Sequence, residues 1–265
     1  MEGFERLNLN PVANKMKRYK LIQYLDEYLH SAEFSDLGPN GLQVEGRNEI
    51  KKIVTAVSAS VELFEKAVDM QADAVLVHHG IIWDFERPIY KGGYKRRVKL
   101  LLENEINLLA YHLPLDAHLE VGNNAVMARL LGLENIQPFG EYKGQYVGIK
   151  GELPGKRAED LFTLIKDKIK SDPLIFPYGP RTVSHVGLIS GGAQKEVKQA
   201  IEQGLDVFIS GEVSEFVMHL VKEEGIHYVA AGHYATERFG VQALGEHLQE
   251  IFNLDTVFVD IPNPA

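Results

Sequence analysis

Residues 53–80 read IVTAVSASVELFEKAVDMQADAVLVHHG and contain the unit from which the rest of the chain is assembled. Residues 52–58 (KIVTAVS) are mostly apolar and residues 74–77 (AVLV) entirely so, as in strands that are buried in a parallel sheet. Between them, residues 61–70 carry apolar side chains at the spacing of an amphipathic helix. This stretch therefore predicts a strand, a helix and a second, parallel strand.

The same alternation continues to the end of the chain. Further strands are predicted at residues 107–111, 145–150, 183–189, 206–210, 227–231 and 256–260. Helices are predicted at residues 96–104, 123–131, 157–170, 193–203, 214–224 and 236–250. A proline-rich connection follows residue 170, and residues 36–44 are expected to turn into an extended segment. Strands that alternate with helices are typical of an α/β fold with largely parallel sheets.

The chain contains a weak internal repeat. Residues 53–60 match residues 186–193 in pattern, and the stretch that begins at His112 matches the stretch that begins at His233. We interpret the chain as two related α/β lobes, each built on a β-α-β-α-β unit. The predicted boundaries are residues 16–134 for the first lobe, 135–226 for the second, and 227–265 for a C-terminal segment that returns to the cleft between them.

The composition limits the kinds of site that this chain can hold. It has 265 residues, a net charge of −9 and no cysteine. The lack of cysteine excludes disulfides, thiolate metal sites and cysteine nucleophiles. An acidic chain with one local basic cluster is not expected to bind nucleic acid in a sequence-specific way.

A cytoplasmic location is expected by default for a chain without cysteine. No apolar run approaches the roughly 20 residues that a membrane helix needs, so no membrane partner is expected. The first residues lack the basic and apolar regions of a signal peptide. Because Met16 precedes a Lys/Arg-rich helix start, residues 1–15 are expected to be an extension from an alternative start.

Histidines and carboxylates follow three of the predicted strands. The three groups are His78 with His79, His112 with Asp116, and His233 with Glu237. In open α/β sheets, ligands bind at the carboxyl edge of the strands, where these groups lie. A helix that begins near residue 234 would place His233 and Glu237 on one face. Pro114 argues against a regular helix in the first copy, so Asp116 is expected to reach inward from a turn.

Five of these side chains are predicted metal ligands: His78, His79, Asp116, His233 and Glu237. Adjacent side chains diverge on an extended chain, so the two neighbouring histidines suit two neighbouring ions, and Glu237 is expected to bridge them. Mixed imidazole and carboxylate ligands suit Fe, Mn, Zn, Ni or Co better than Ca or Mg. We therefore predict two divalent ions per subunit, in the cleft between the lobes.

Such a site is expected to be catalytic. Five protein ligands leave open positions on two ions, which is typical of catalytic rather than structural metal sites. Paired ions can activate water and polarise a phosphoryl or carbonyl-type centre. His112 and Glu237 are the predicted catalytic residues, with His112 as a proton shuttle. The alternative for His112, and for Glu212, is to orient a ligand, because ligating histidines usually need a partner.

Three weaker features each allow two interpretations. Residues 190–193 (SGGA) could bind a phosphate with backbone amides, or could form only a tight turn. The basic side chains within residues 91–99 could contact the phosphates of a nucleotide, or could be a solvated helix start. Phe85, Tyr90 and Tyr94 could stack on a base, or could belong to the core.

At these residues the sequence resembles the GTP cyclohydrolase I type 2 homologue family, the Nif-three-like dinuclear-metal proteins. The resemblance covers residues 16–265 and rests on PNGLQVEG at 39–46, VHHG at 77–80, HLPLDAH at 112–118, GNNA at 122–125, SGEVSE at 210–215, AGHYATER at 231–238 and DIPNPA at 260–265. It implies the same five metal ligands and a two-lobed α/β subunit. It also implies a toroidal homohexamer whose sites face a central cavity. The large inserted domain of some members is missing here.

Three functions remain open at this point. The open two-metal geometry indicates a metal-dependent hydrolase that acts on a nucleotide or related heterocycle. The lack of a clear substrate pocket in the sequence allows a non-enzymatic metal-handling or regulatory hexamer instead. A scaffold with a vestigial site is the third possibility. Metal exchange separates the first two, because a carrier releases its ions readily whereas a catalytic site retains them.

Overall fold

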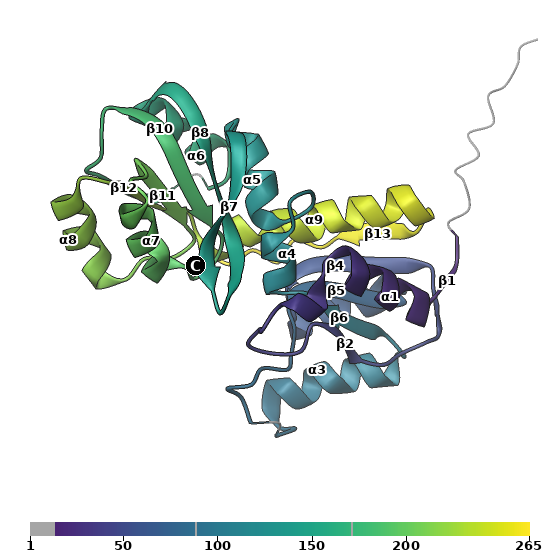
Figure 1. The fold of residues 1–265 in the computed structure, drawn as a ribbon. Helices are drawn as coiled ribbons and strands as arrows, with labels where there is room; N and C mark the ends of the chain where they lie inside the picture. Colours follow the sequence, from purple (N-terminus) through teal and green to yellow (C-terminus); the bar gives the residue numbers. More distant parts are fainter. Residues whose placement is uncertain (1–13, 88, 171) are drawn as a thin grey trace, which may run out of the picture.

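The structure is a computed structural model that describes residues 14–87, 89–170 and 172–265. It contains two large sheets, each with helices on both of its faces. The two sheets lie at opposite ends of the molecule, and the long helix α9 connects them (Figure 1). The α/β class is therefore confirmed. The expected extension at residues 1–15 lies almost entirely outside the described residues.

The first sheet has five strands in the order β13-β4-β5-β6-β2. Their bounds are Asp255–Phe258, Lys52–Ser58, Ala74–His79, Asn107–Ala110 and Gly41–Val44. The first four are parallel, and β2 is an antiparallel edge strand. The helices α2 (Val61–Asp69) and α3 (Gly92–Glu103) pack on one face, and α1 (Arg18–Tyr28) and α9 (His233–Phe252) pack on the other. Burial on both faces explains why the residues of β4 and β5 are mostly apolar.

The second sheet has six strands in the order β7-β8-β10-β11-β12-β9. Their bounds are Glu134–Tyr142, Gln145–Arg157, Thr182–Ile189, Val207–Ser210, His227–Ala230 and Leu174–Pro177. The middle strands β10, β11 and β12 are parallel, whereas β7, β8 and β9 pair antiparallel. The helices α7 (Val197–Glu202) and α8 (Glu215–Glu224) cover one face, and α5 (Asn123–Leu131) and α6 (Ala158–Lys168) cover the other.

The expectation of largely parallel sheets is correct for the first sheet and wrong for the outer strands of the second. The sequence analysis does not predict β7 or β9. Most of β7 is exposed at the edge of the sheet, and it contains Pro138 and Gly140, which are tolerated in edge strands but are typical of turns. The strand β9 has four residues, too few for a period to be recognised, and it lies in the proline-rich connection.

A short helix, α4 (Leu113–Ala117), occupies the stretch in which the sequence analysis predicts a turn. That prediction is wrong because Pro114 lies in the first turn of the helix, where the missing N–H has no intrahelical partner to lose. The helix begins immediately after His112 and ends before His118. It therefore presents Asp116 from its first turn toward the end of β5.

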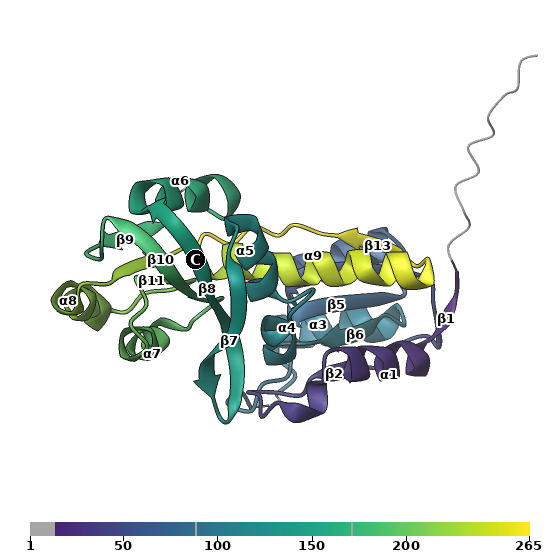
Figure 2. The same cartoon turned by 45° about the horizontal axis from the view of Figure 1, so that its top comes forward.

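The helix α9 carries the chain from one sheet to the other (Figure 2). It follows β12 of the second sheet, packs against β4 and α5, and leads into β13 of the first sheet. The close approach to α5 needs Gly240, because a Cβ there would lie 2.8 Å from Oδ1 of Asn123. The C-terminal segment is thus divided between the two sheets, with its first strand in one and its last strand in the other.

The remaining elements are short. Strands β1 (Met16–Lys17) and β3 (Glu49–Ile50) form a two-stranded sheet. Single 3-10 turns occupy Ser31–Glu33 and Gln194–Glu196, and the second replaces the first turn of the helix predicted at 193–203. Among the helices of the described part of the chain, none is both long and apolar enough to span a membrane.

Candidate metal centre

Six side chains of the three groups meet where the two sheets face each other. Three overlapping sets have ligand atoms within 4.8 Å of one another: His78, His79 and His112; His79, His233 and Glu237; His78, Asp116 and Glu237. The histidine pair ends β5, His112 and Asp116 flank the start of α4, and the last two residues lie on the first turns of α9. The structure therefore brings together every predicted site residue.

Glu237 lies at the centre of this cluster. Its Oε1 atom is 3.1 Å from Nε2 of His233 and 3.5 Å from Nε2 of His78, and its Oε2 atom is 3.2 Å from Nε2 of His79. The Oδ2 atom of Asp116 lies 3.5 Å from Nε2 of His78. One carboxylate thus faces three imidazoles, which is the arrangement expected of a group that bridges two sites.

Each candidate histidine is held through its Nδ1 atom. His78 Nδ1 lies 3.0 Å from the carbonyl of Tyr111, and His79 Nδ1 lies 2.9 Å from Oγ of Ser58. His233 Nδ1 is 2.7 Å from Oε1 of Glu212, the orienting group expected from the sequence, whereas Ser58 and the carbonyl of Tyr111 are not expected from it. Partners of this kind fix the ring so that Nε2 is the atom left to bind an ion.

The carboxylate of Asp116 is held in the same way. Its Oδ1 atom accepts hydrogen bonds from Nδ2 of Asn123 at 2.8 Å and from Oγ of Ser190 at 2.7 Å. These donors come from α5 and from the end of β10, so both halves of the chain orient one candidate ligand. Sequence spacing contains no signal for them, because they lie 7 and 74 residues from Asp116.

The glycine-rich turn after β10 lets the backbone approach the cluster. Gly191 has φ +65°, and a Cβ at this position would lie 2.2 Å from Oε1 of Glu237. The amide of Gly191 donates to Thr236 Oγ1, and the amide of Ala193 donates to Ser210 Oγ. Because the protein itself uses these amides, the tight-turn interpretation of residues 190–193 is favoured over a phosphate site.

The donor atoms at the centre fit a metal ion. Nε2 of His78 and Oε2 of Glu237 are buried and make no hydrogen bond of good geometry to a described residue, although each lies at ion-pair distance from a neighbouring side chain. An unsatisfied buried imidazole nitrogen and an unsatisfied buried carboxylate oxygen are each costly. A divalent cation between them would satisfy both atoms, and imidazole with carboxylate is a donor set that transition metals favour.

The charges of the cluster are strongly coupled. Burial disfavours the charged form of His78, but the Asp116 and Glu237 carboxylates outweigh burial and raise the pKa of His78 to about 9. Burial lowers the pKa of His79. Burial alone would raise the pKa of Glu237, but the surrounding histidines hold it well below its usual range. In the absence of metal the carboxylates thus stabilise a proton on His78, and a metal ion bound there would have to displace it.

Asp36 is a site residue that the sequence analysis misses. Its Oδ1 atom lies 2.7 Å from Nδ1 of His112, and its Oδ2 atom accepts from the amide of Leu113 and from Nδ2 of Asn40. It comes from the loop before β2, far from any predicted strand end. Burial raises the pKa of Asp36, but its bonds to His112 and Asn40 outweigh burial and lower it to about 2.

The depressed pKa makes Asp36 a source of acid sensitivity. The stabilisation is complete above the ordinary carboxyl pKa of 3.8 and is lost as the pH falls through about 2. We expect Asp36→Asn to lower the free energy of unfolding by about 2 kcal/mol near neutral pH. The loss should be much smaller near pH 2, where the Asp36 carboxylate itself becomes protonated. Denaturant unfolding across pH measures the difference. Asp69→Asn, at an exposed position, is the control, and an equal loss at every pH would contradict the assignment.

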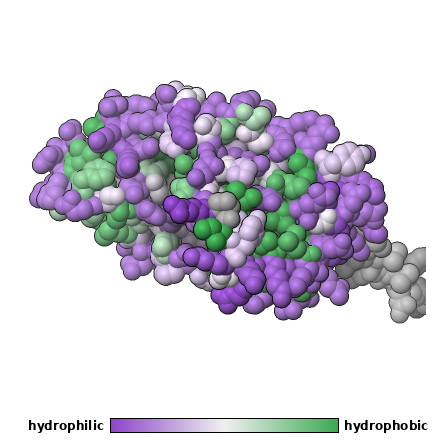
Figure 3. All heavy atoms as spheres, turned by 90° about the horizontal axis from the view of Figure 1, so that it is seen from below, coloured by the Kyte–Doolittle hydropathy of each residue, from purple (hydrophilic) through white to green (hydrophobic). Residues whose placement is uncertain are grey.

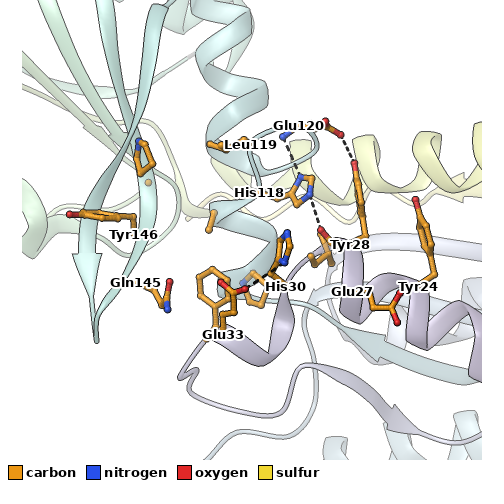
Figure 4. Close-up of a pocket in the computed structure, with 16 residues that line it drawn as sticks. Tyr24, Glu27, Tyr28, His30, Glu33, His118, Leu119, Glu120, Gln145 and Tyr146 are labelled. Carbon is orange, nitrogen blue, oxygen red and sulfur yellow. Dashed lines mark hydrogen bonds and ion pairs between the residues drawn. The ribbon is translucent and has the colours of Figure 1, made fainter.

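A large cavity lies away from this cluster. It has a volume of about 730 Å³ and lies between α1 with its following 3-10 turn and the hairpin β7–β8 (Figure 4). Pro114 and Ala117 of α4 line it, while Asp116 of the same helix faces the histidines. The hollow that touches His78 and His112 has a volume of only about 10 Å³. Little space is therefore open on the side of the candidate metal centre where His78 and His112 lie.

Comparisons with known proteins identify relatives over nearly the whole chain. The model of the family Duf34/NIF3 (NGG1p interacting factor 3) matches residues 16–264. A protein of Pasteurella multocida named GTP cyclohydrolase 1 type 2 homolog is 47% identical over 252 residues, which cover 94% of this chain and 100% of that protein.

Solved structures share the fold. The structure of protein ybgI, described as of unknown function, has a TM-score of 0.89 and 46% identity, and the match covers 94% of this chain and 100% of that one. TTHA1606 from Thermus thermophilus has a TM-score of 0.88 and 38% identity, with the same coverage of both chains. The resemblance drawn from the sequence is thereby confirmed.

Proposed function

Because the chain belongs to the Duf34/NIF3 family, we propose that it is a dinuclear metal-dependent hydrolase that acts on a nucleotide or related heterocycle. The observation that carries this proposal is that two of the three donor sets share Glu237. One set adds His79 and His233 to it, and the other adds His78 and Asp116. Two ions that share one bridging carboxylate would use all five predicted ligands.

The ligand chemistry favours Fe, Mn, Zn, Ni or Co, two ions per subunit. Bound ions of this kind would supply Lewis acidity and activated water. The residues of the chain supply orientation and proton handling. Ser58, Glu212 and the carbonyl of Tyr111 hold the three imidazoles, and Asn123 with Ser190 holds Asp116.

His112 is proposed to move a proton during the reaction. Its ring lies 4.9 Å from the ring of His78 and 5.5 Å from that of His79, at the edge of the cluster. Asp36 holds its Nδ1 atom, as a carboxylate does for a histidine that works as an acid or base through Nε2. Its side chain is partly exposed, so a proton can exchange with solvent.

The His112→Ala variant tests this role. We expect it to bind two metal ions per chain and to lower kcat by about 100-fold or more, which is the usual contribution of a general acid or base. Metal analysis and steady-state kinetics measure the two quantities. The control is His185→Ala, at an exposed position on β10. A loss of metal would instead make His112 a ligand, and unchanged kinetics would remove it from the mechanism.

The experiment that tests the proposed function is a turnover screen. Protein loaded separately with Mn, Fe or Zn is incubated with nucleotides and cell extract, and products are detected by mass spectrometry. The proposal expects a hydrolysis product that requires both metal and Glu237. Metal-loaded protein that converts nothing would contradict a hydrolase.

The small hollow beside the cluster favours a second candidate function, a metal-handling or regulatory protein. A hollow of about 10 Å³ beside His78 and His112 leaves little room for a substrate in this conformation. Transfer of ions to an apo-acceptor separates the two functions. Rapid release would support metal handling, and retention would support catalysis.

The organisation of the subunit and its assembly are proposed as follows. Residues 16–134 and 135–226 form two related lobes, and residues 227–265 return the last ligands to the cleft. Parallel triplets of strands in both sheets support the repeat, with β4, β5 and β6 in one and β10, β11 and β12 in the other.

We further propose a cytoplasmic, toroidal homohexamer. Light scattering tests the assembly, and a monomeric mass would contradict it.

A further inference from the structure

Trp83, the sole tryptophan of the chain, lies against the candidate metal centre. Its ring centroid is 5.4 Å from that of His112, with an edge-on geometry of 89°, and 6.0 Å from that of His79. The ring is half-buried rather than enclosed in the core. A large aromatic surface therefore borders the site on the side of β5.

Phe85 extends this aromatic surface into solvent. Its ring stacks on Trp83 with a centroid separation of 5.7 Å and an interplanar angle of 22°. Yet Phe85 is 69% exposed, so packing in the core does not explain it. Figure 3 views the molecule from the side on which α3 lies and shows hydrophobic surface patches among hydrophilic ones. The rings of His112, Trp83 and Phe85 thus form a continuous path from the site to the surface.

The backbone holds Trp83 firmly in this position. The amide of Asp84 donates to the carbonyl of Leu37 at 2.8 Å, and the amide of Ile81 donates to Oε1 of Gln43 at 2.7 Å. A Cβ on Gly38 would lie 2.4 Å from the carbonyl of Ile82, so the two segments approach closely. These contacts fix the backbone at Ile81, Ile82 and Asp84, on both sides of Trp83. Phe85 follows directly in the chain.

We propose that Trp83 and Phe85 form a stacking platform for the planar heterocycle of the substrate. Aromatic rings present π-faces that stack on any base, and the adjacent histidines would place the stacked ring beside the metal ligands. This inference rests on the proposed function for the identity of the substrate, but the stacking itself can be measured without turnover. We assign recognition of the substrate to its planar heterocycle and not to a phosphate group.

The lone tryptophan reports directly on binding. Zinc-loaded protein is titrated with adenosine, guanosine and ribose 5-phosphate, and tryptophan emission is excited beyond the absorption band of the bases. We expect saturable quenching by the nucleosides and none by ribose 5-phosphate. Quenching by ribose 5-phosphate alone would show recognition of the phosphate and would overturn the platform.

Variants of Phe85 separate stacking from other roles. We expect Phe85→Ala and Phe85→Leu both to weaken nucleoside binding by about tenfold, because neither retains a π-face. Tyr19→Ala, which removes an exposed ring from α1, is the control. Unchanged binding in both Phe85 variants would overturn the proposal, as would a change in molecular mass by light scattering, which would make Phe85 a contact between copies of the chain.

The titration of zinc-loaded protein and the turnover screen together keep the two proposals distinguishable. If the hydrolase proposal fails and the platform is correct, nucleosides still quench Trp83 although nothing is turned over. If the platform fails and the hydrolase is correct, Phe85→Ala turns over substrate with unchanged KM. Either proposal can therefore fail while the other holds.

Discussion

Glu237→Gln is expected to abolish both full metal loading and turnover. The carboxylate faces His78, His79 and His233, and it is shared by two donor sets, so its loss removes a ligand from both ions. Loss of outer partners of a metal site alone costs 10–100-fold in affinity. We therefore expect metal affinity to fall by at least about 100-fold, and turnover with it. Metal content after dialysis and product formation measure both effects.

A matched control lies on the same helix. Glu246 is an exposed residue of α9, and Glu246→Gln makes the same change of charge and size away from the cluster. It should leave metal content and activity unchanged. A Glu237→Gln protein that keeps two ions per chain would contradict the bridging role of this residue.

Gly191→Ala is expected to damage both the stability and the metal centre. The residue has φ +65°, and its new Cβ would lie 2.2 Å from Oε1 of Glu237 and 3.2 Å from Nε2 of His233. Alanine in this backbone conformation costs about 1 kcal/mol. The close contact adds more, because either the turn or the Glu237 carboxylate must move. We expect about 2–4 kcal/mol lower stability and a marked loss of metal affinity.

Gly204 provides the comparison for this substitution. It has φ +67°, and a Cβ there would meet nothing within 4 Å. Gly204→Ala therefore includes the backbone strain without the contact, and should cost about 1 kcal/mol while leaving metal binding intact. Denaturant unfolding and metal titration of both variants give the difference. Equal behaviour of the two would mean that Gly191 serves the backbone turn alone.

The first sheet and the candidate ligands could be predicted because their signals are local. Buried parallel strands such as β4 and β5 are rich in apolar residues, and ligands that follow such strands must meet at one edge of the sheet. The predicted helix at Asn123–Leu131 coincides with α5. Its Gly132, with φ +74°, is a typical stop signal for a helix.

The rest depends on contacts that no local pattern encodes. Edge strands such as β7 are exposed and short of apolar residues, so neither period nor composition distinguishes them from loops. Asp36 lies 76 residues from His112, and Ser190 lies 74 residues from Asp116. Ser190 reaches Asp116 only when the two sheets face each other, and Asp36 reaches His112 only when the loop before β2 packs beside the end of β6. The proximity of Trp83 to the site likewise depends on how the loop after β5 packs on the loop before β2.

The most direct measurement is anomalous diffraction from a crystal of the metal-loaded protein, collected at the absorption edge of the added metal. The account predicts two peaks per chain, one beside His79 and His233 and one beside His78 and Asp116, with Glu237 between them. A single peak, or peaks away from these five side chains, would contradict a dinuclear centre.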